Sequence, residues 1–114
     1  MQAIDFHTKI AGVTFSNDDG SERQSLIEDL ADQLDTSGSA PVTLKRDRAN
    51  PHDVNAIAVL DGEGRQLGFL PARVSAQVAP LMDRGVVVKV EVACVTGNGL
   101  LQNYGVNIRV WTNG

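Results

Sequence analysis

Residues that could bind a phosphate-bearing ligand gather just before the middle of the chain. Lys45, Arg46 and Arg48 form the densest group of basic side chains, and such side chains contact the phosphates of nucleic acids. The net charge of −4 and the pI of about 4.9 argue against broad coating of DNA, but a pocket for one or two nucleotides depends on the local field. Because Asp47 lies inside the group, ordinary ion pairs at a solvated strand end are the alternative interpretation.

A polar segment, residues 47–55, follows the basic group. Asn50 precedes Pro51, which favours an extended or turn conformation at that point. Asn50, Asp53 and Asn55 have short polar side chains that can bond to nearby backbone amides and fix the shape of a loop. Loop-building and ligand contact therefore both remain open for these three residues.

Signals for catalysis or for a metal are weak. His7 and His52 are the two histidines, Cys94 is the one cysteine, and the spacings C-x-x-C and H-x-x-x-H do not occur. The chain has no G-x-S-x-G and no phosphate-loop motif. We therefore expect a protein that is not an enzyme and that has no cofactor and no metal site.

The cellular setting follows from cysteine use and hydropathy. A single cysteine forms no internal disulfide, which favours a cytoplasmic location. No segment approaches the roughly 20 apolar residues that cross a bilayer, and the first nine residues lack a signal-peptide layout. No membrane association is expected, and the sequence does not indicate the oligomeric state.

Periodicity predicts the elements that must position the polar segment. Apolar alternation and turn residues predict about six short strands, at 7–15, 42–46, 56–60, 66–70, 86–95 and 104–111. Apolar residues at helical spacing predict one helix over 22–34 and a second one beginning at Pro71. The fold class is thus mainly β, a small and partly open β-barrel with two short helices.

Several details of these elements can be tested. Ser21 and Gln24 match a capping box at the start of the first helix. Pro80 should kink or split the second helix, and Gly85 should cap it. In the fifth strand, Cys94 should lie on the same side as Val88, Val90 and Val92.

Ordered motifs in this pattern resemble the HIRAN domain family. Asn50-Pro51-His52-Asp53 and 55–59 (N-A-I-A-V) match the loop and the strand that follows it, and 67–71 (L-G-F-L-P) and 76–81 (A-Q-V-A-P-L) match the next strand and helix. Residues 10–15 look like the family's opening strand. The motifs span 9–85, and strands within 86–111 would complete the domain.

The resemblance implies an OB-like barrel that fills residues 1–114 as a single, free-standing domain. HIRAN domains accompany fork-remodelling helicases and ubiquitin ligases, and they also occur alone in bacteria and phages. In the helicase-linked members the domain captures the 3′ end of single-stranded DNA. We therefore expect a nucleic-acid-binding module linked to DNA repair or replication-fork processing, with single-stranded DNA and a helicase or nuclease as partners.

The resemblance also assigns residues, position by position. Asp53 would accept a hydrogen bond from the terminal 3′-hydroxyl, with His52 and Asn50 beside it in the loop. Phe15 and Phe69 stand at aromatic positions of the family, although such residues more often belong to the core than to a stacking platform. The expected DNA-binding residues are Asp53, His52, Asn50, Phe69, Phe15, Arg73, Arg46, Arg48 and Lys45.

This sequence departs from the DNA-binding members at three positions. Thr14 and Ser16 replace an arginine and a second aromatic, and Ala72 replaces a lysine for which the adjacent Arg73 could substitute. The alternative function is therefore a protein-interaction module that keeps the fold and has lost the DNA pocket.

Overall fold

The computed structural model describes residues 3–113 and contains six strands and two helices in those residues. The mainly β class with two helices is thereby confirmed. In chain order the elements are β1 (Asp5–Lys9), α1 (Arg23–Ser37), β2 (Val42–Arg46), β3 (Ile57–Asp61), β4 (Gln66–Phe69), α2 (Ala72–Asp83), β5 (Lys89–Thr96) and β6 (Gly105–Trp111).

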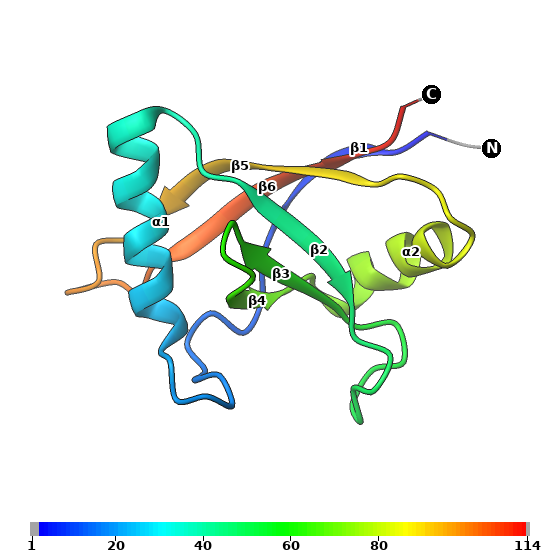
Figure 1. Cartoon of the computed structure of the whole chain (residues 1–114), viewed down its shortest axis with the longest axis horizontal. Coiled ribbons are helices and arrows are strands. Elements are labelled where there is room, and N and C mark those ends of the chain that lie inside the picture. The colour runs from blue at the N-terminus through cyan, green and yellow to red at the C-terminus, as the bar shows by residue number, and fades with distance from the viewer. Residues whose placement is uncertain (1–2, 114) are drawn as a thin grey trace.

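Two antiparallel sheets of three strands form the body of the molecule (Figure 1). One has the order β1-β6-β5 and the other β2-β3-β4. Backbone bonds between Ala11 and Phe69, 2.7 Å and 2.9 Å long, join the sheets just after β1. Within residues 3–113 no ladder joins β2 to β5, so the barrel is partly open there.

The core lies between the two sheets and the inner faces of the helices. Ile27 of α1, Ile57 of β3, Val78 of α2 and Ile108 of β6 are fully buried. The alternation predicted for the last strand is confirmed, because Val106, Ile108 and Val110 all face inward. In α1 the buried residues include Leu26, Ile27 and Leu30, at the helical spacing that predicted this face.

The first strand differs from the prediction. It covers Asp5–Lys9 and not 7–15. Gly12 has a φ of 72°, and the N–H of Phe15 bonds to the carbonyl of Gly12 in a turn. The left-handed backbone at Gly12 ends the strand, which is why the alternation read through residue 15 was wrong.

The capping box at the start of α1 is also wrong. The Ser21 hydroxyl donates to Asp19, and Gln24 reaches instead to the backbone of Val13 and Tyr104. The Gln24 side chain, which a capping box needs at the start of the helix, is therefore bonded to distant backbone groups instead. The helix continues to Ser37 and ends at Gly38, whose φ is 79°.

The second half of the chain confirms one detail and corrects two. Gly85, with a φ of 82°, follows α2 as predicted. Pro80 does not split α2, which runs unbroken from Ala72 to Asp83; the proline removes the one N–H that would bond to the carbonyl four residues earlier, and the other bonds of the helix remain. Cys94 is exposed because a β-bulge after Val92 shifts the alternation of β5 by one residue.

Candidate nucleic-acid interface

The loop between β2 and β3 is built by its own side chains. Asn50 Oδ1 accepts from the N–H groups of His52, at 2.8 Å, and Asp53, at 3.1 Å. Asn50 Nδ2 donates to Asp47 Oδ2 at 3.3 Å. Asp53 Oδ1 accepts from the N–H of Asn55 at 2.8 Å. These bonds hold the loop in one shape, as the sequence predicted for Asn50 and Asp53.

One carboxylate oxygen of Asp53 has no hydrogen-bond partner in the described part of the chain. Its side chain is half-buried, and among the described residues its Oδ2 atom accepts no hydrogen bond. A carboxylate has lone pairs for about four hydrogen bonds, so Asp53 can build the loop and still accept from a hydroxyl group. His52 is exposed beside it.

Two of the three clustered cations are engaged inside the molecule. Arg46 donates to Asp83 at 3.0 Å and to the carbonyl groups of Ala56 and Val54. Arg48 donates to Asp83 at 2.7 Å. The hydrogen bonds that Asp83 accepts from Arg46 lower the pKa of the Asp83 carboxyl from its ordinary value. This clamp of Arg46, Arg48 and Asp83 ties the loop to the end of α2 and neutralises much of the local positive charge.

Phe15 and Phe69 converge on Gly12. A Cβ placed on Gly12 would lie 3.5 Å from Phe15 Cδ2 and 3.8 Å from Phe69 Cδ2. Phe15 is 66% exposed, and Phe69 is half-buried. Phe15 is therefore not a core residue, and the two distances place the Cδ2 atoms of the two rings no more than about 7 Å apart.

Arg23 completes this aromatic cluster and is absent from the residues that the sequence singled out as DNA-binding. It is 7% exposed, and it donates to the Gly12 carbonyl and to Asn17 Oδ1, both at 2.8 Å. Its guanidinium carbon lies 5.5 Å from the centre of the Phe69 ring, within cation–π range. Burial lowers the pKa of Arg23. Its sequence position, three residues before Leu26 on the apolar stripe of α1, is the signal that indicates burial.

A hollow of about 550 Å³ lies beside this cluster. Arg23, Asn50 and Phe69 line it, together with the acidic Asp18 and Asp47. A neighbouring hollow of about 310 Å³ contains Lys45 and shares Asp47, Gly64 and Gln66 with the first one. We call the two hollows the outer groove of the β2-β3-β4 sheet.

The β ladder accounts for the continuity of the outer groove. Lys45 pairs with Ala58, Ala58 pairs with Phe69, and Phe69 pairs with Ala11. Residues paired directly across antiparallel strands point to the same face. Lys45 and Phe69 therefore lie on one surface, although 24 positions separate them in the sequence.

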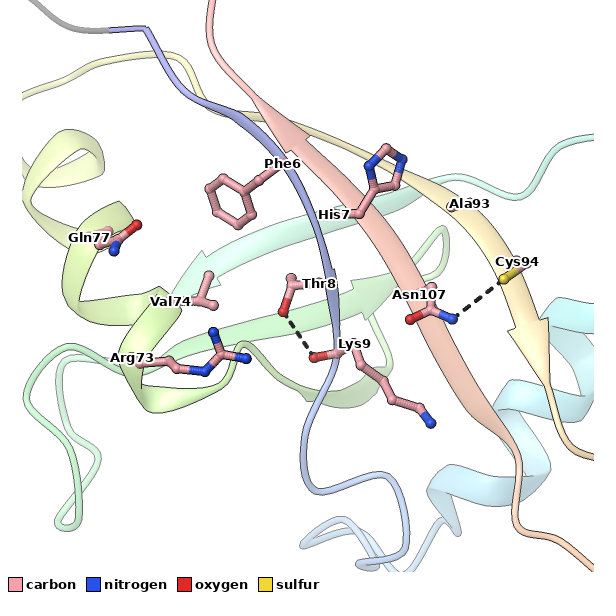
Figure 2. A pocket seen from close by; sticks show the side chains of 10 residues that line it. All are labelled: Phe6, His7, Thr8, Lys9, Arg73, Val74, Gln77, Ala93, Cys94 and Asn107. Carbon is pink, nitrogen blue, oxygen red and sulfur yellow. Dashed lines mark hydrogen bonds between the residues drawn. The ribbon is translucent and has the colours of Figure 1, made fainter.

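Arg73 lies elsewhere. It lines a third hollow of about 750 Å³, together with His7 and Lys9 of β1 and Val74 of α2 (Figure 2). Of the nine residues that the sequence singled out, the structure thus brings Lys45, Arg46, Asn50 and Phe69 to the outer groove, with Phe15 beside Phe69. Arg48, His52 and Asp53 belong to the loop next to the groove.

Neither a metal site nor a membrane span is found in the described part of the chain. Residues 3–113 contain no group of three or more His, Cys, Asp or Glu side chains placed to hold a metal ion. The helices in the same residues are all too short or too polar to cross a bilayer.

Two solved structures are similar to this one. The HIRAN domain of human HLTF is 22% identical, with a TM-score of 0.53 over 97% of this chain and 76% of that chain. A protein from Lactobacillus plantarum is 22% identical, with a TM-score of 0.59 over 98% of each chain. At this identity the similarity concerns the fold alone. No curated protein gives a significant match to the chain.

The sequence itself carries stronger evidence of descent. The sequence profile of the HIRAN domain matches residues 5–113, which include every strand and helix described above. That span is wider than residues 9–85, which contain the recognisable motifs, and it takes in β5 and β6. The chain therefore belongs to the HIRAN domain family, whose members are in general nucleic-acid-binding modules without catalytic activity of their own.

Proposed function

We propose that this protein captures the 3′ end of single-stranded DNA in the outer groove, with residues 1–114 acting as one module. The observation that carries the proposal is the convergence of Phe15 and Phe69 on Gly12. The loop that holds Asp53 borders the same groove through Asn50. In the cell, capture of a 3′ end would serve DNA repair or replication-fork processing, with a helicase or nuclease as the partner.

The chemistry of each group fits one part of a DNA end. The terminal bases stack on Phe15 and Phe69, and such stacking contributes about 1–3 kcal/mol per base. Asp53 Oδ2 accepts a hydrogen bond from the 3′-hydroxyl, and its negative charge repels a 3′-phosphate. Lys45 supplies a cation to the backbone phosphates, because among residues 3–113 its ammonium group forms no ion pair. With so few phosphate contacts, we expect binding with a shallow salt dependence.

Fluorescence anisotropy with short labelled oligonucleotides tests the proposal. The protein should prefer a 3′-hydroxyl end over a 3′-phosphate end at low salt. Asp53→Asn should abolish that preference, because an amide keeps the Oδ1 acceptor that caps Asn55 and replaces the charged oxygen with a donor. Asp35→Asn, on the exposed side of α1, is the matched control and should change nothing. Equal affinity of the unaltered protein for both ends would refute end recognition.

A second candidate function is a protein-interaction module, and one observation favours it. Leu100 and Leu101 are 89% and 93% exposed between β5 and β6. The Oδ1 atom of Asn98 accepts from the N–H groups of both leucines, so the loop holds them in a fixed conformation. Leu100→Ser with Leu101→Ser should then abolish capture of a protein partner in a pull-down and leave oligonucleotide binding unchanged. Failure of the unaltered protein to bind DNA, with capture intact, would make this the main function.

A further inference from the structure

Strand β1 is an edge strand with backbone groups that pair with nothing in the sheet. Its partner β6 bonds to the even-numbered residues, since the Ile4 carbonyl accepts from Thr112 at 2.9 Å and the N–H of Ile10 donates to Val106 at 3.0 Å. In an antiparallel pair these groups alternate along the strand. The N–H and C=O groups of Asp5, His7 and Lys9 therefore point away from β6, toward the free edge.

Space lies along this edge. The hollow of about 750 Å³ is lined by four consecutive residues of β1, Phe6 to Lys9. Figure 2 shows Phe6 pointing to the α2 side of the strand and His7 pointing the opposite way. The other residues that line the hollow lie on both sides of β1: Arg73, Val74 and Gln77 on α2, and Ala93, Cys94 and Asn107 on β5 and β6. The hollow therefore passes around the free edge, with α2 as its far wall, and leaves room there for an incoming strand. Among the described residues the side-chain contact to these edge groups is one hydrogen bond of 3.3 Å, from the Thr8 hydroxyl to the Lys9 carbonyl, and that oxygen has a second lone pair.

The sequence of β1, D-F-H-T-K, is complementary to itself when read antiparallel. With a two-fold axis at His7, Asp5 lies opposite Lys9 of a second copy, and Phe6 lies opposite Thr8. We propose that a second copy of this chain occupies the edge, so that two β1 strands pair through these residues and the two sheets become one of six strands. Each odd-numbered residue then exchanges its N–H and C=O with the residue opposite. The interface is isologous, as a two-fold dimer requires.

The charges of β1 favour pairing with β1 of a second copy over pairing with other strands. A lysine on an edge strand ordinarily discourages pairing with other strands. In the proposed register, Asp5 of the second copy lies opposite Lys9 and offsets its charge. Lys9 forms no salt bridge within residues 3–113. Asp5 is held by Arg109 at 2.8 Å on the exposed face of the sheet, so a Lys9 from the second copy would join a network of charges already in place. Opposite charges placed directly across strands stabilise the pair, whereas like charges destabilise it.

Sedimentation velocity over a concentration series tests the pairing with the full-length protein. The unaltered chain should shift from a 12.2 kDa monomer to a dimer. His7→Pro removes the central edge-facing N–H and leaves the bonds to β6 intact. It should weaken the dimer about thirtyfold, for two lost hydrogen bonds at the axis. His7→Ala keeps the N–H and should dimerise like the unaltered protein. A protein that stays monomeric at every concentration would overturn the proposal.

A charge exchange distinguishes this register from any other edge contact and does not depend on how well the proline variant folds. Lys9→Glu places two acids opposite each other, and Asp5→Lys places two lysines opposite each other. Each variant alone should be monomeric where the unaltered protein is dimeric. An equimolar mixture of the two should restore the dimer, because every pair in it is again of opposite charge. A mixture that remains monomeric, or single variants that dimerise normally, would overturn the register. The readout contains no DNA and is independent of the proposed end capture.

Discussion

Two arginine-centred regions border the outer groove and use the same side chain in opposite ways. At the start of α1, Arg23 is almost fully buried and donates to neutral acceptors, the Gly12 carbonyl and the Asn17 amide. At the end of α2, Arg46 donates to the carboxylate of Asp83. A positive charge bonded to neutral dipoles keeps its field, whereas one paired with a carboxylate loses most of it at a distance. For a phosphate in the proposed site, Arg23 would therefore supply more attraction than the dense group around Arg46, against the opposing charge of the nearby Asp18.

The largest effect is expected from removing Arg23. Arg23→Ala leaves the Gly12 carbonyl and Asn17 without their donor and frees the turn that carries Phe15. We expect the free energy of unfolding to fall by about 3 kcal/mol, since hydrogen bonds to charged groups contribute about 1.5–3 kcal/mol each. Urea denaturation measures the change. Arg84→Ala, at an exposed arginine after α2, should stay within about 0.5 kcal/mol of the unaltered protein. Equal losses in both variants would mean that the buried hydrogen bonds of Arg23 do not stabilise the fold.

Phe15, in the same region as Arg23, should matter for DNA binding and not for the stability of the fold. Its ring is 66% exposed, so Phe15→Ala should change the free energy of unfolding by no more than about 0.5 kcal/mol. Loss of one stacking surface should weaken oligonucleotide binding by about 1–3 kcal/mol, at least fivefold. Anisotropy titration and urea denaturation on the same sample give both numbers. A stable variant with unaltered affinity would exclude Phe15 from the interface.

Asn50 tests the loop that joins the groove to the Arg46 clamp. Asn50→Ala removes the acceptor for two N–H groups, those of His52 and Asp53. Stability should fall by about 1 kcal/mol, the usual cost of a lost cap. Discrimination between 3′-hydroxyl and 3′-phosphate ends should also decline, because Asp53 is no longer held. Asn55→Ala is the control on the same loop. If Asn50→Ala leaves end discrimination intact, Asp53 does not need the shape of this loop.

The sequence predicted the elements better than it predicted the site. Apolar periodicity located β2, β3, β4 and both helices, since those patterns depend on which face is buried. It extended β1 too far, because the positive φ of Gly12 is invisible to an alternation count. The partners of Arg46 and Arg23 were equally hidden. Asp83 lies 37 positions from Arg46, and Gly12 lies 11 positions from Arg23, so only the folded chain shows which cation is neutralised.

The smallest effect, and the one that tests the contrast most directly, comes from Asp83. Asp83→Ala releases Arg46 and Arg48 from the carboxylate that they share. If the Asp83 carboxylate neutralises the charges of these two arginines, the variant should bind single-stranded DNA more tightly. The slope of log affinity against log salt should steepen by about 0.7 for each phosphate gained. Titrations at several salt concentrations measure the slope, and Asp35→Ala, on the exposed side of α1, is the control. An unchanged slope would mean that Arg46 and Arg48 do not face the DNA even when they are free.

The same variant should alter the response to acid. The pKa of the Asp83 carboxyl is lowered in the folded protein, chiefly by its hydrogen bonds to Arg46. A lowered pKa contributes stability that is present above the ordinary value of 3.8 and is lost as the pH falls through the lower folded value. Asp83→Ala lacks that contribution, so between about pH 5 and about pH 2 its stability should decline less steeply than that of the unaltered protein. Thermal melts measure this difference. If the melting temperatures of the two proteins fall equally across this range, the carboxylate does not hold the two arginines, and the contrast between Arg46 and Arg23 does not stand.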